Sequence, residues 1–141
     1  LTLTIMEGLL IRTGTSQYII PLDCIIETFI AAPEEITIMP DGAEFVRKRN
    51  LLYPVKRLHR IHSLTGAVEQ LSAGIQLLVK DRDNQALLFI DEIVGQETTV
   101  VKSLPDYLGS VSTVSGCAIL GNGEICQILN IPAIIEHVCI I

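Results

Sequence analysis

The chain has no uninterrupted apolar run near the roughly 20 residues that a helix needs to cross a bilayer. Hydrophobic residues nevertheless make up 49% of its 141 residues, so they are expected to fill a core or sticky interfaces. The chain carries no signal peptide, and it opens on Leu1 rather than Met. We therefore predict a piece of a longer protein, without direct membrane insertion.

Positive charge is also scarce, with ten Lys and Arg against sixteen Asp and Glu and a formal net charge of −6. This balance disfavours the attraction to phosphates that supports nucleic-acid binding. One basic stretch has a single aromatic residue, Tyr53, for stacking on bases. It holds six of the ten basic residues: Arg47, Lys48, Arg49, Lys56, Arg57 and Arg60. We expect a solvated or partner-facing rim and no nucleic acid, with a barrel that binds nucleic acid or sugar as an alternative.

Residues suited to catalysis or metal binding are few and scattered. The four cysteines form no CxxC pair and the three histidines lie in no recognisable motif, so neither a zinc site nor a nucleophile–base pair is indicated. Cysteines among aliphatic neighbours are typical of a reducing compartment. The segment GNG at 121–123 lacks the pattern of a phosphate-binding loop. The sequence predicts no catalytic residue, no metal and no cofactor, and hence a binding module.

The chain is rich in signals for β-structure. Short runs of Ile, Leu and Val alternate with turn residues, which predicts about ten short strands. The expected turns contain Gly14, Gly42, Asn50 and the pair Asn122-Gly123, the last as a two-residue hairpin turn. Helices are expected only at 55–64 and 131–138, each after a strand. The prediction is an all-β fold with short helices.

The same pattern occurs twice in the chain. LLIRTGTSQYIIPLDCIIE matches LLVKDRDNQALLFIDEIVG position by position, so that Leu9 falls over Leu77. Further along, 50–58 matches 123–131 at a slightly larger spacing, with Leu52 over Ile125 as a shared buried position. Units of about seventy residues rarely stand alone, so the two copies should share or interleave their cores. Two small closed barrels would remove exposed strand edges, and 62–74 would connect them.

Four segments, in their order along the chain, resemble one family. They are LLIRTGTSQYIIPLDCIIET, RNLLYPVKRL, FIDEIVGQETTVVKSL and SGCAILGNGEICQILNIPAII. Together they are similar to a CheW-like domain, most of all to the C-terminal regulatory domain of the chemotaxis histidine kinase CheA. GQETTVVKSL and SGCAILGNGEICQIL favour the kinase over the free adaptor CheW, and LTLTIM resembles the strand that leaves the kinase's ATP-binding domain. Asn50 stands where the family has the glycine of an Arg-Gly turn.

The resemblance implies a fold of two SH3-like five-stranded β-barrels related by a pseudo-twofold axis. It implies one domain over 1–141, made of interleaved units of roughly 18–72 and 1–17 with 73–141. The implied function is that of a non-enzymatic regulatory scaffold of a sensor histidine kinase in two-component signal transduction. It would dock the CheW adaptor and the tips of methyl-accepting chemoreceptors, beside the kinase's ATP-binding and dimerisation domains. The implied location is the cytoplasm, at receptor arrays beneath the inner membrane. A free CheW-type coupling adaptor is the alternative.

Docking of this kind needs a few exposed apolar side chains at strand edges and a charged rim that fixes the register. One candidate set flanks the turn at Pro40-Asp41-Gly42, and the other lies in the second unit. The candidate partner-binding residues are Ile38, Met39, Phe45, Val46 and Arg49 in the first set and Val100, Val101 and Lys102 in the second. A place in the core is the alternative for each of them.

Overall fold

The computed structural model describes residues 4–102 and 113–137, and within them it confirms the all-β class with short helices after strands. The strands are β1 (Thr4–Thr13), β2 (Ser16–Pro21), β3 (Ile25–Phe29), β4 (Ile36–Ile38), β5 (Glu44–Lys48), β6 (Leu51–Arg57), β7 (Ile75–Asp81), β8 (Asn84–Ile90), β9 (Glu92–Lys102), β10 (Val114–Ile119) and β11 (Ile125–Leu129). The helices are α1 (Leu58–Ile61) and α2 (Ile131–Glu136). Three single 3-10 turns cover Leu22–Cys24, Pro33–Glu35 and Leu71–Ala73. α1 is shorter than the predicted 55–64, because β6 continues to Arg57 and the helix ends at Ile61.

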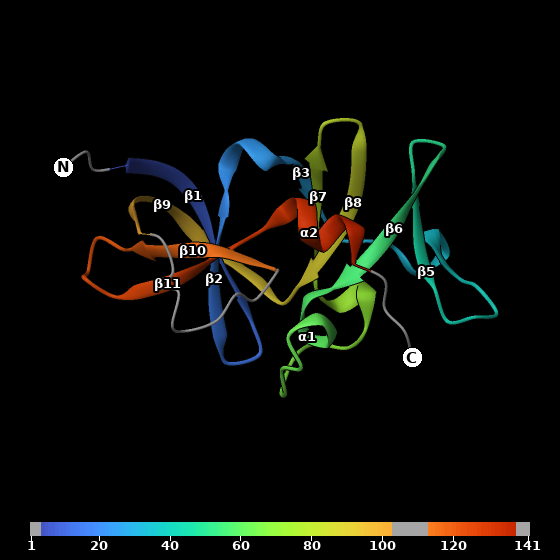
Figure 1. The fold of residues 1–141 in the computed structure, drawn as a ribbon. Helices are drawn as coiled ribbons and strands as arrows, with labels where there is room; N and C mark the ends of the chain where they lie inside the picture. Colours follow the sequence, from blue (N-terminus) through green and yellow to red (C-terminus); the bar gives the residue numbers. More distant parts are fainter. Residues whose placement is uncertain (1–3, 103–112, 138–141) are drawn as a thin grey trace.

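The strands form two sheets that lie side by side (Figure 1). β1, β2, β11, β10 and β9 close into a five-stranded barrel, which we call the first barrel. The second sheet has six strands in the order β3-β7-β8-β6-β5-β4. In the first barrel the long strand β9 pairs with both β1 and β10. In the second sheet two separate strands take the place of β9: β3 pairs with β7, and β4 pairs with β5.

The strand registers repeat the two matches found in the sequence. In the second sheet, the parallel pairing of β6 with β8 places Val55 opposite Leu87. In the first barrel, the parallel pairing of β11 with β2 places Ile128 opposite Ile19. Ile128 is the counterpart of Val55 in the sequence repeat, and Ile19 is the counterpart of Leu87. The match between the two halves is therefore structural and not a coincidence of aliphatic composition.

A β-bulge is repeated as well. The ladder between β3 and β7 skips Ile26, and the ladder between β9 and β1 skips Val94, the counterpart of Ile26 in the repeat. A bulge bends its strand and increases the twist, so the same bend occurs at the same place in both units. Both skipped side chains are exposed.

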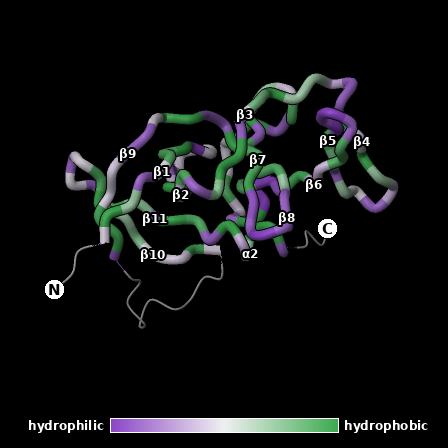
Figure 2. Tube along the Cα trace, turned by 90° about the horizontal axis from the view of Figure 1, so that it is seen from above, coloured by the Kyte–Doolittle hydropathy of each residue, from purple (hydrophilic) through white to green (hydrophobic). Residues whose placement is uncertain are grey.

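The main core lies between the two units. In β1, Leu9 and Ile11 belong to this shared core, whereas Leu10 belongs to the interior of the first barrel. β7 repeats the arrangement, with Leu77 in the shared core and Leu78 in the interior of the second sheet. Strands that are buried on both faces need consecutive apolar residues, which explains the repeated aliphatic runs. The β7–β8 turn, by contrast, is hydrophilic (Figure 2).

Of the two helices, α2 packs on the other unit, whereas α1 packs mainly on β8 and β6 of its own sheet. α2 follows β11 of the first barrel and packs on β7 and β8 of the second sheet (Figure 1). α1 follows β6 of the second sheet, and the residue that ends it, His62, contacts Tyr18 of β2. The strand grouping differs from the expected division into 18–72 and 1–17 with 73–141, because β2 lies in the first barrel and β7 and β8 lie in the second sheet. The physical reason is that each tight hairpin keeps its two strands in one sheet.

The expected turn residues are left-handed with one exception. Positive φ angles occur at Gly14 (62°), Gly42 (91°), Asn50 (65°) and Gly123 (88°). Asn122 has no positive φ, so the predicted two-residue turn at Asn122-Gly123 is wrong. Leu120 N–H donates to the Glu124 carbonyl at 2.8 Å, which closes a three-residue loop instead. The Asn122 side chain accepts the N–H of Glu124 at 2.9 Å, as an Asx turn does.

The segment 62–74, which connects β6 to β7 within the second sheet, is held by a buried carboxylate. Asp91, whose side chain is 2% exposed, accepts the backbone N–H groups of Gly14 at 2.9 Å and Val68 at 3.0 Å. Arg12 lies 3.4 Å from the same carboxylate. One side chain thereby ties the β1–β2 turn, the start of β9 and the connection 62–74 together. Asp23, its counterpart in the repeat, is exposed.

We expect Asp91→Ala to lower the free energy of unfolding by about 2–3 kcal/mol, because two backbone N–H groups lose a charged acceptor. Asp23→Ala is the matched control and should cost less than about 0.5 kcal/mol, since this side chain is exposed. Urea denaturation of both variants measures the difference. Equal losses at the two positions would contradict the role given to Asp91.

Candidate interaction surface

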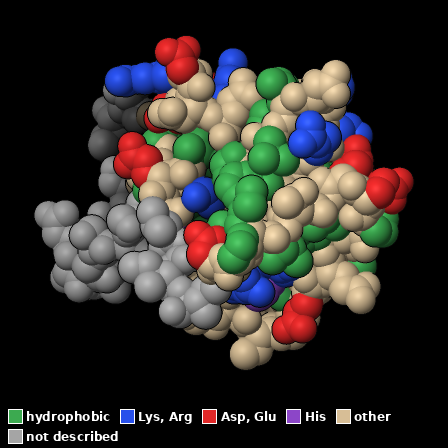
Figure 3. All heavy atoms as spheres, turned by 90° about the vertical axis from the view of Figure 1, so that its right-hand side faces the viewer, with side chains coloured by type: hydrophobic (Ala, Val, Ile, Leu, Met, Phe, Trp, Pro, Cys, Tyr) green, Lys and Arg blue, Asp and Glu red, His purple; other side chains and the backbone are tan. Residues whose placement is uncertain are grey.

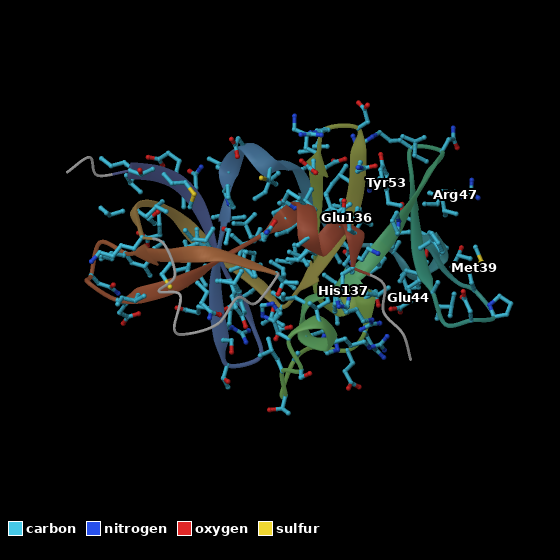
Figure 4. All side chains as sticks on the ribbon, viewed as in Figure 1. Met39, Glu44, Arg47, Tyr53, Glu136 and His137 are labelled. Carbon is cyan, nitrogen blue, oxygen red and sulfur yellow. The ribbon has the colours of Figure 1, made fainter. Side chains whose placement is uncertain are left out.

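The β4–β5 end of the second sheet carries the first set of expected docking residues. Ile38 is 66% exposed, and Met39 and Phe45 are half-buried. Val46 is fully buried in the interior of the second sheet, so its side chain has no surface to offer a partner. Phe45 and Val46 are neighbours on one strand, and successive side chains point to opposite faces. In Figure 4, Met39 and Glu44 mark this end of the sheet and Arg47 lies further along β5.

The sequence suggested that Arg49 lies beside the apolar residues around the Pro40-Asp41-Gly42 turn, but the structure places it elsewhere. It lies in the β5–β6 turn, four strand residues beyond Phe45 and so about 14 Å away along β5. Its guanidinium forms an ion pair with Glu27 of β3. Beside it, Lys48 lies 4.6 Å from the centre of the Phe29 ring. Arg49 therefore connects the β5–β6 turn to β3 and remains 61% exposed on its outer side.

The second set lies at the end of β9, where this strand pairs with β10. Val101 stands opposite Ala118 and packs against the core of the first barrel, and Val100 is also half-buried. Lys102 is exposed. The pairings give Val101 the place that Ile36 has in β4, opposite the buried Val46 of the second sheet. The two expected sets therefore occupy equivalent ends of the two units.

A buried ion pair supports the β4–β5 end. Glu44, which stands opposite Ile38, accepts two hydrogen bonds from Arg57, at 2.6 Å from Nε and 2.8 Å from Nη2. Arg57 also donates to the Glu69 carbonyl at 2.5 Å and lies 5.3 Å from the centre of the Phe89 ring. The bonds from Arg57 lower the pKa of Glu44 below its ordinary value, although burial acts in the opposite direction. This end of the sheet is thus anchored to β6, β8 and the connection 62–74.

The basic stretch forms no free cationic patch within the described residues. Arg49 and Lys48 face Glu27 and Glu35, and Arg57 and Arg60 both lie near Glu44. Lys56 donates to the His137 carbonyl at 2.7 Å. Within residues 4–102 and 113–137, Arg47 alone of these six makes no ion pair or side-chain hydrogen bond. Cations that are already paired offer little to a phosphate backbone, which weakens the nucleic-acid alternative.

Leu52 and Ile125, a matched pair in the repeat, are exposed contrary to expectation. Leu52 is 42% exposed and Ile125 is 71% exposed, although both were expected to be buried. They stand at equivalent places near the start of β6 and of β11, one in each unit. Around β5 and β6, hydrophobic side chains gather at the centre of this end of the molecule with charged side chains around them (Figure 3). The sequence repeat could have revealed these two positions, because it aligns Leu52 with Ile125 and places both just after a turn.

Residues with potential chemistry remain separate in the folded chain. Within the two described ranges, no three His, Cys, Asp or Glu side chains are grouped so that they could hold a metal ion. Burial raises the pKa of the Cys24 and Cys126 thiols to about 11, which makes them poor nucleophiles. Cys139 lies outside the described residues. No helix in those ranges is long and apolar enough to cross a membrane.

Comparison with known proteins identifies the family. The CheW-like domain family matches residues 7–139. This chain belongs to that family. Among curated proteins, the CheW-like domain is 35% identical over 138 residues to the chemotaxis protein CheA of Bacillus subtilis, covering 96% of this chain and 20% of that protein. It is 27% identical over 134 residues to CheA of Klebsiella aerogenes, covering 95% of this chain and 21% of that protein.

A solved structure supports the fold of the CheW-like domain. It is that of the scaffolding protein TtCheW from Thermoanaerobacter tengcongensis, with a TM-score of 0.71 and 14% sequence identity over 90% of both chains. At this identity the likeness establishes the fold alone. The chain spans about a fifth of the length of the CheA proteins that it matches.

We expect Glu44→Gln to destabilise the CheW-like domain by about 3 kcal/mol at pH 7, because Arg57 would lose its buried partner. The pKa of Glu44 is depressed in the folded state, so its contribution is present above about pH 4.5 and disappears as the pH falls further. The difference between wild type and variant should therefore shrink below pH 4.5 in urea denaturation. Glu34→Gln, an exposed change, is the control. A difference that stays constant down to about pH 3 would refute this assignment.

Proposed function

We propose that this CheW-like domain is the regulatory scaffold of a chemotaxis histidine kinase of the CheA type. The similarity to CheA proteins over about 95% of the chain carries the proposal. In this role the domain docks the coupling adaptor CheW and the cytoplasmic tips of chemoreceptors. Their state is passed to autophosphorylation in the neighbouring ATP-binding domain. The domain itself contributes no catalytic group, and its place is in the cytoplasm at receptor arrays beneath the inner membrane.

Docking is proposed to use the ends of the two units. At the second sheet, Ile38, Met39 and Phe45 offer an apolar edge beside the anchored Glu44–Arg57 pair. At the first barrel, Lys102 with the partly buried Val100 and Val101 forms the equivalent edge. An interface core is apolar and its rim is charged, which is the composition of both ends. Because the ends are equivalent in the repeat, each suits a partner barrel of the same family.

A free CheW-type adaptor is the second candidate. It would have the same fold, since the structural likeness to a CheW scaffolding protein covers 90% of both chains. The coding sequence upstream of Leu1 separates the two candidates, because an ATP-binding domain there identifies the kinase. In vitro, kinase activity of the full-length protein with receptor and adaptor provides the corresponding biochemical test.

We expect the 141-residue chain to co-elute with CheW of the same organism in size-exclusion chromatography. Phe45→Ala and Arg49→Glu should each weaken this association about tenfold, while the melting temperature stays nearly unchanged. The physical reason is the loss of an apolar contact in one variant and of a rim charge in the other. Isothermal titration with purified CheW gives the affinities.

Arg49 needs a matched control because it is already paired with Glu27. Glu27→Gln breaks the same internal ion pair and leaves the Arg49 charge available to a partner. If Glu27→Gln weakens adaptor binding as much as Arg49→Glu does, Arg49 acts within the domain and not in the interface. Val46→Ala should lower stability, since the side chain is fully buried. Unaltered binding by both Phe45→Ala and Arg49→Glu would remove this surface from the proposal.

A further inference from the structure

A polar bridge crosses the boundary between the two units beside the shared core. His62, which ends α1 of the second sheet, is 2.9 Å from the Tyr18 hydroxyl through Nδ1 and 2.8 Å from the Thr113 hydroxyl through Nε2. The His62 and Tyr18 rings also meet edge to face, with centroids 5.1 Å apart. Tyr18 belongs to β2 and Thr113 directly precedes β10, so both hydroxyls belong to the first barrel.

The bridge continues into the second helix. The Thr113 carbonyl accepts the N–H of Asn130 at 2.8 Å. The Asn130 side chain in turn accepts the N–H of Ala133 and caps α2. The His62 ring therefore stands at one end of a chain of hydrogen bonds that joins the end of α1 to the start of α2. α2 packs on the other unit, and α1 reaches the first barrel through His62.

The repeat does not require this bridge. In the two sequence matches, the positions equivalent to His62 and Tyr18 are Ile135 and Ala86. Ile135 packs against the shared core, and Ala86 is fully buried. At this position the second helix makes an apolar contact, whereas the residue that ends the first helix carries a titratable ring. His62 and Tyr18 form a polar contact where the other unit has two apolar residues, which indicates a specific role for this contact.

The surroundings of His62 accommodate a neutral ring and oppose a charged one. With a neutral ring, one nitrogen donates and the other accepts, so each hydroxyl has a complementary partner. A protonated ring can only donate, so both hydroxyls must then accept, and the hydroxyl proton that the neutral ring accepted loses its partner. The hollow beside the ring is lined by uncharged residues: Tyr18, Ile61, Ser63, Thr113, Val114 and Gln127. Burial, and then the nearby His137, lower the pKa of His62, and among the described residues no carboxylate opposes them.

We propose that His62 is a proton-sensitive latch between the two units, which holds α1 on the first barrel while the ring is neutral and weakens that hold when the ring takes up a proton. The proton comes from solvent through the exposed side of the half-buried ring. Its consequence for signalling rests on the proposed function, because a change between the units alters the spacing of the two docking ends. The latch itself is a property of the isolated chain.

The direction of the pH effect follows from linkage. The pKa of His62 is depressed in the folded state, so the unfolded chain binds the proton first as the pH falls. Stability is therefore complete above about pH 7 and decreases as the pH falls below the unfolded value of about 6.5. Between that value and the lower folded pKa, the unfolding constant should rise by up to about tenfold for each pH unit. The pKa of His59 is also lowered, so its contribution to the pH dependence must be separated from that of His62.

The test is urea denaturation of the 141-residue chain between about pH 5.5 and 7.5, without any partner. His62→Gln keeps one donor and one acceptor without a charge in this range, and His62→Ile copies the residue that the other unit uses. Both variants should show a smaller pH dependence than the wild type in this interval, with only the part due to His59 remaining. His59→Gln should keep the part due to His62. NMR titration of the ring nitrogens should give His62 a pKa below 6.5, with changes in the amide signals of α1 and β2 at the same midpoint.

Three results would overturn the latch. One is a pH dependence in His62→Gln as large as that of the wild type, and another is loss of the pH dependence in His59→Gln alone. The third is a His62 titration that leaves the signals of α1 and β2 unchanged. If His62→Ile does not fold, His62→Gln and the wild-type titration still decide the matter. Failure of adaptor binding would affect only the proposed function, because none of these measurements includes CheW.

Discussion

The structure depends on four strands that are buried on both faces. β1, β2, β7 and β8 place alternate side chains in the shared core and in the interior of their own unit. Neither unit could keep these strands out of water by itself, because each has an apolar outer face that only the other unit covers. The two units therefore form a single folding and mechanical body. The aliphatic content of the sequence reflects this double burial.

Double burial also determines where function can lie. The central strands have no surface to offer, so contacts with partners are left to the outer strands, the hairpin turns and the ends of the units. Edge strands with free backbone groups are a risk for aggregation, and here β4 has only three residues while β3 carries a bulge and an ion pair to Arg49. These features protect the edges of the second sheet and still leave Ile38 exposed beside them.

The sequence was sufficient to predict the repeated plan, because consecutive apolar residues and turn residues recur at constant offsets. The pairing of strands far apart in the sequence was harder to predict. The sequence prediction assigned β1 and β2 to separate barrels, whereas the structure has both in the first barrel. Burial of single residues failed for Val46 and Leu52, since apolar residues near a turn can point inward or outward with a change of one position in register. The partner of Arg49 is Glu27, which lies much earlier in the chain on another strand, and no local pattern reveals such a pair.

Where two copies of one plan share a core, their differences carry information that their common features do not. Common features such as the repeated bulge and the parallel registers are explained by packing alone. Asp91 and His62 have counterparts, Asp23 and Ile135, that make none of the same contacts. Asp91 holds the segment 62–74, and His62 ties the end of α1 to the first barrel. Both therefore act where the segment between β6 and β7 of the second sheet meets the first barrel, at Gly14 and Tyr18.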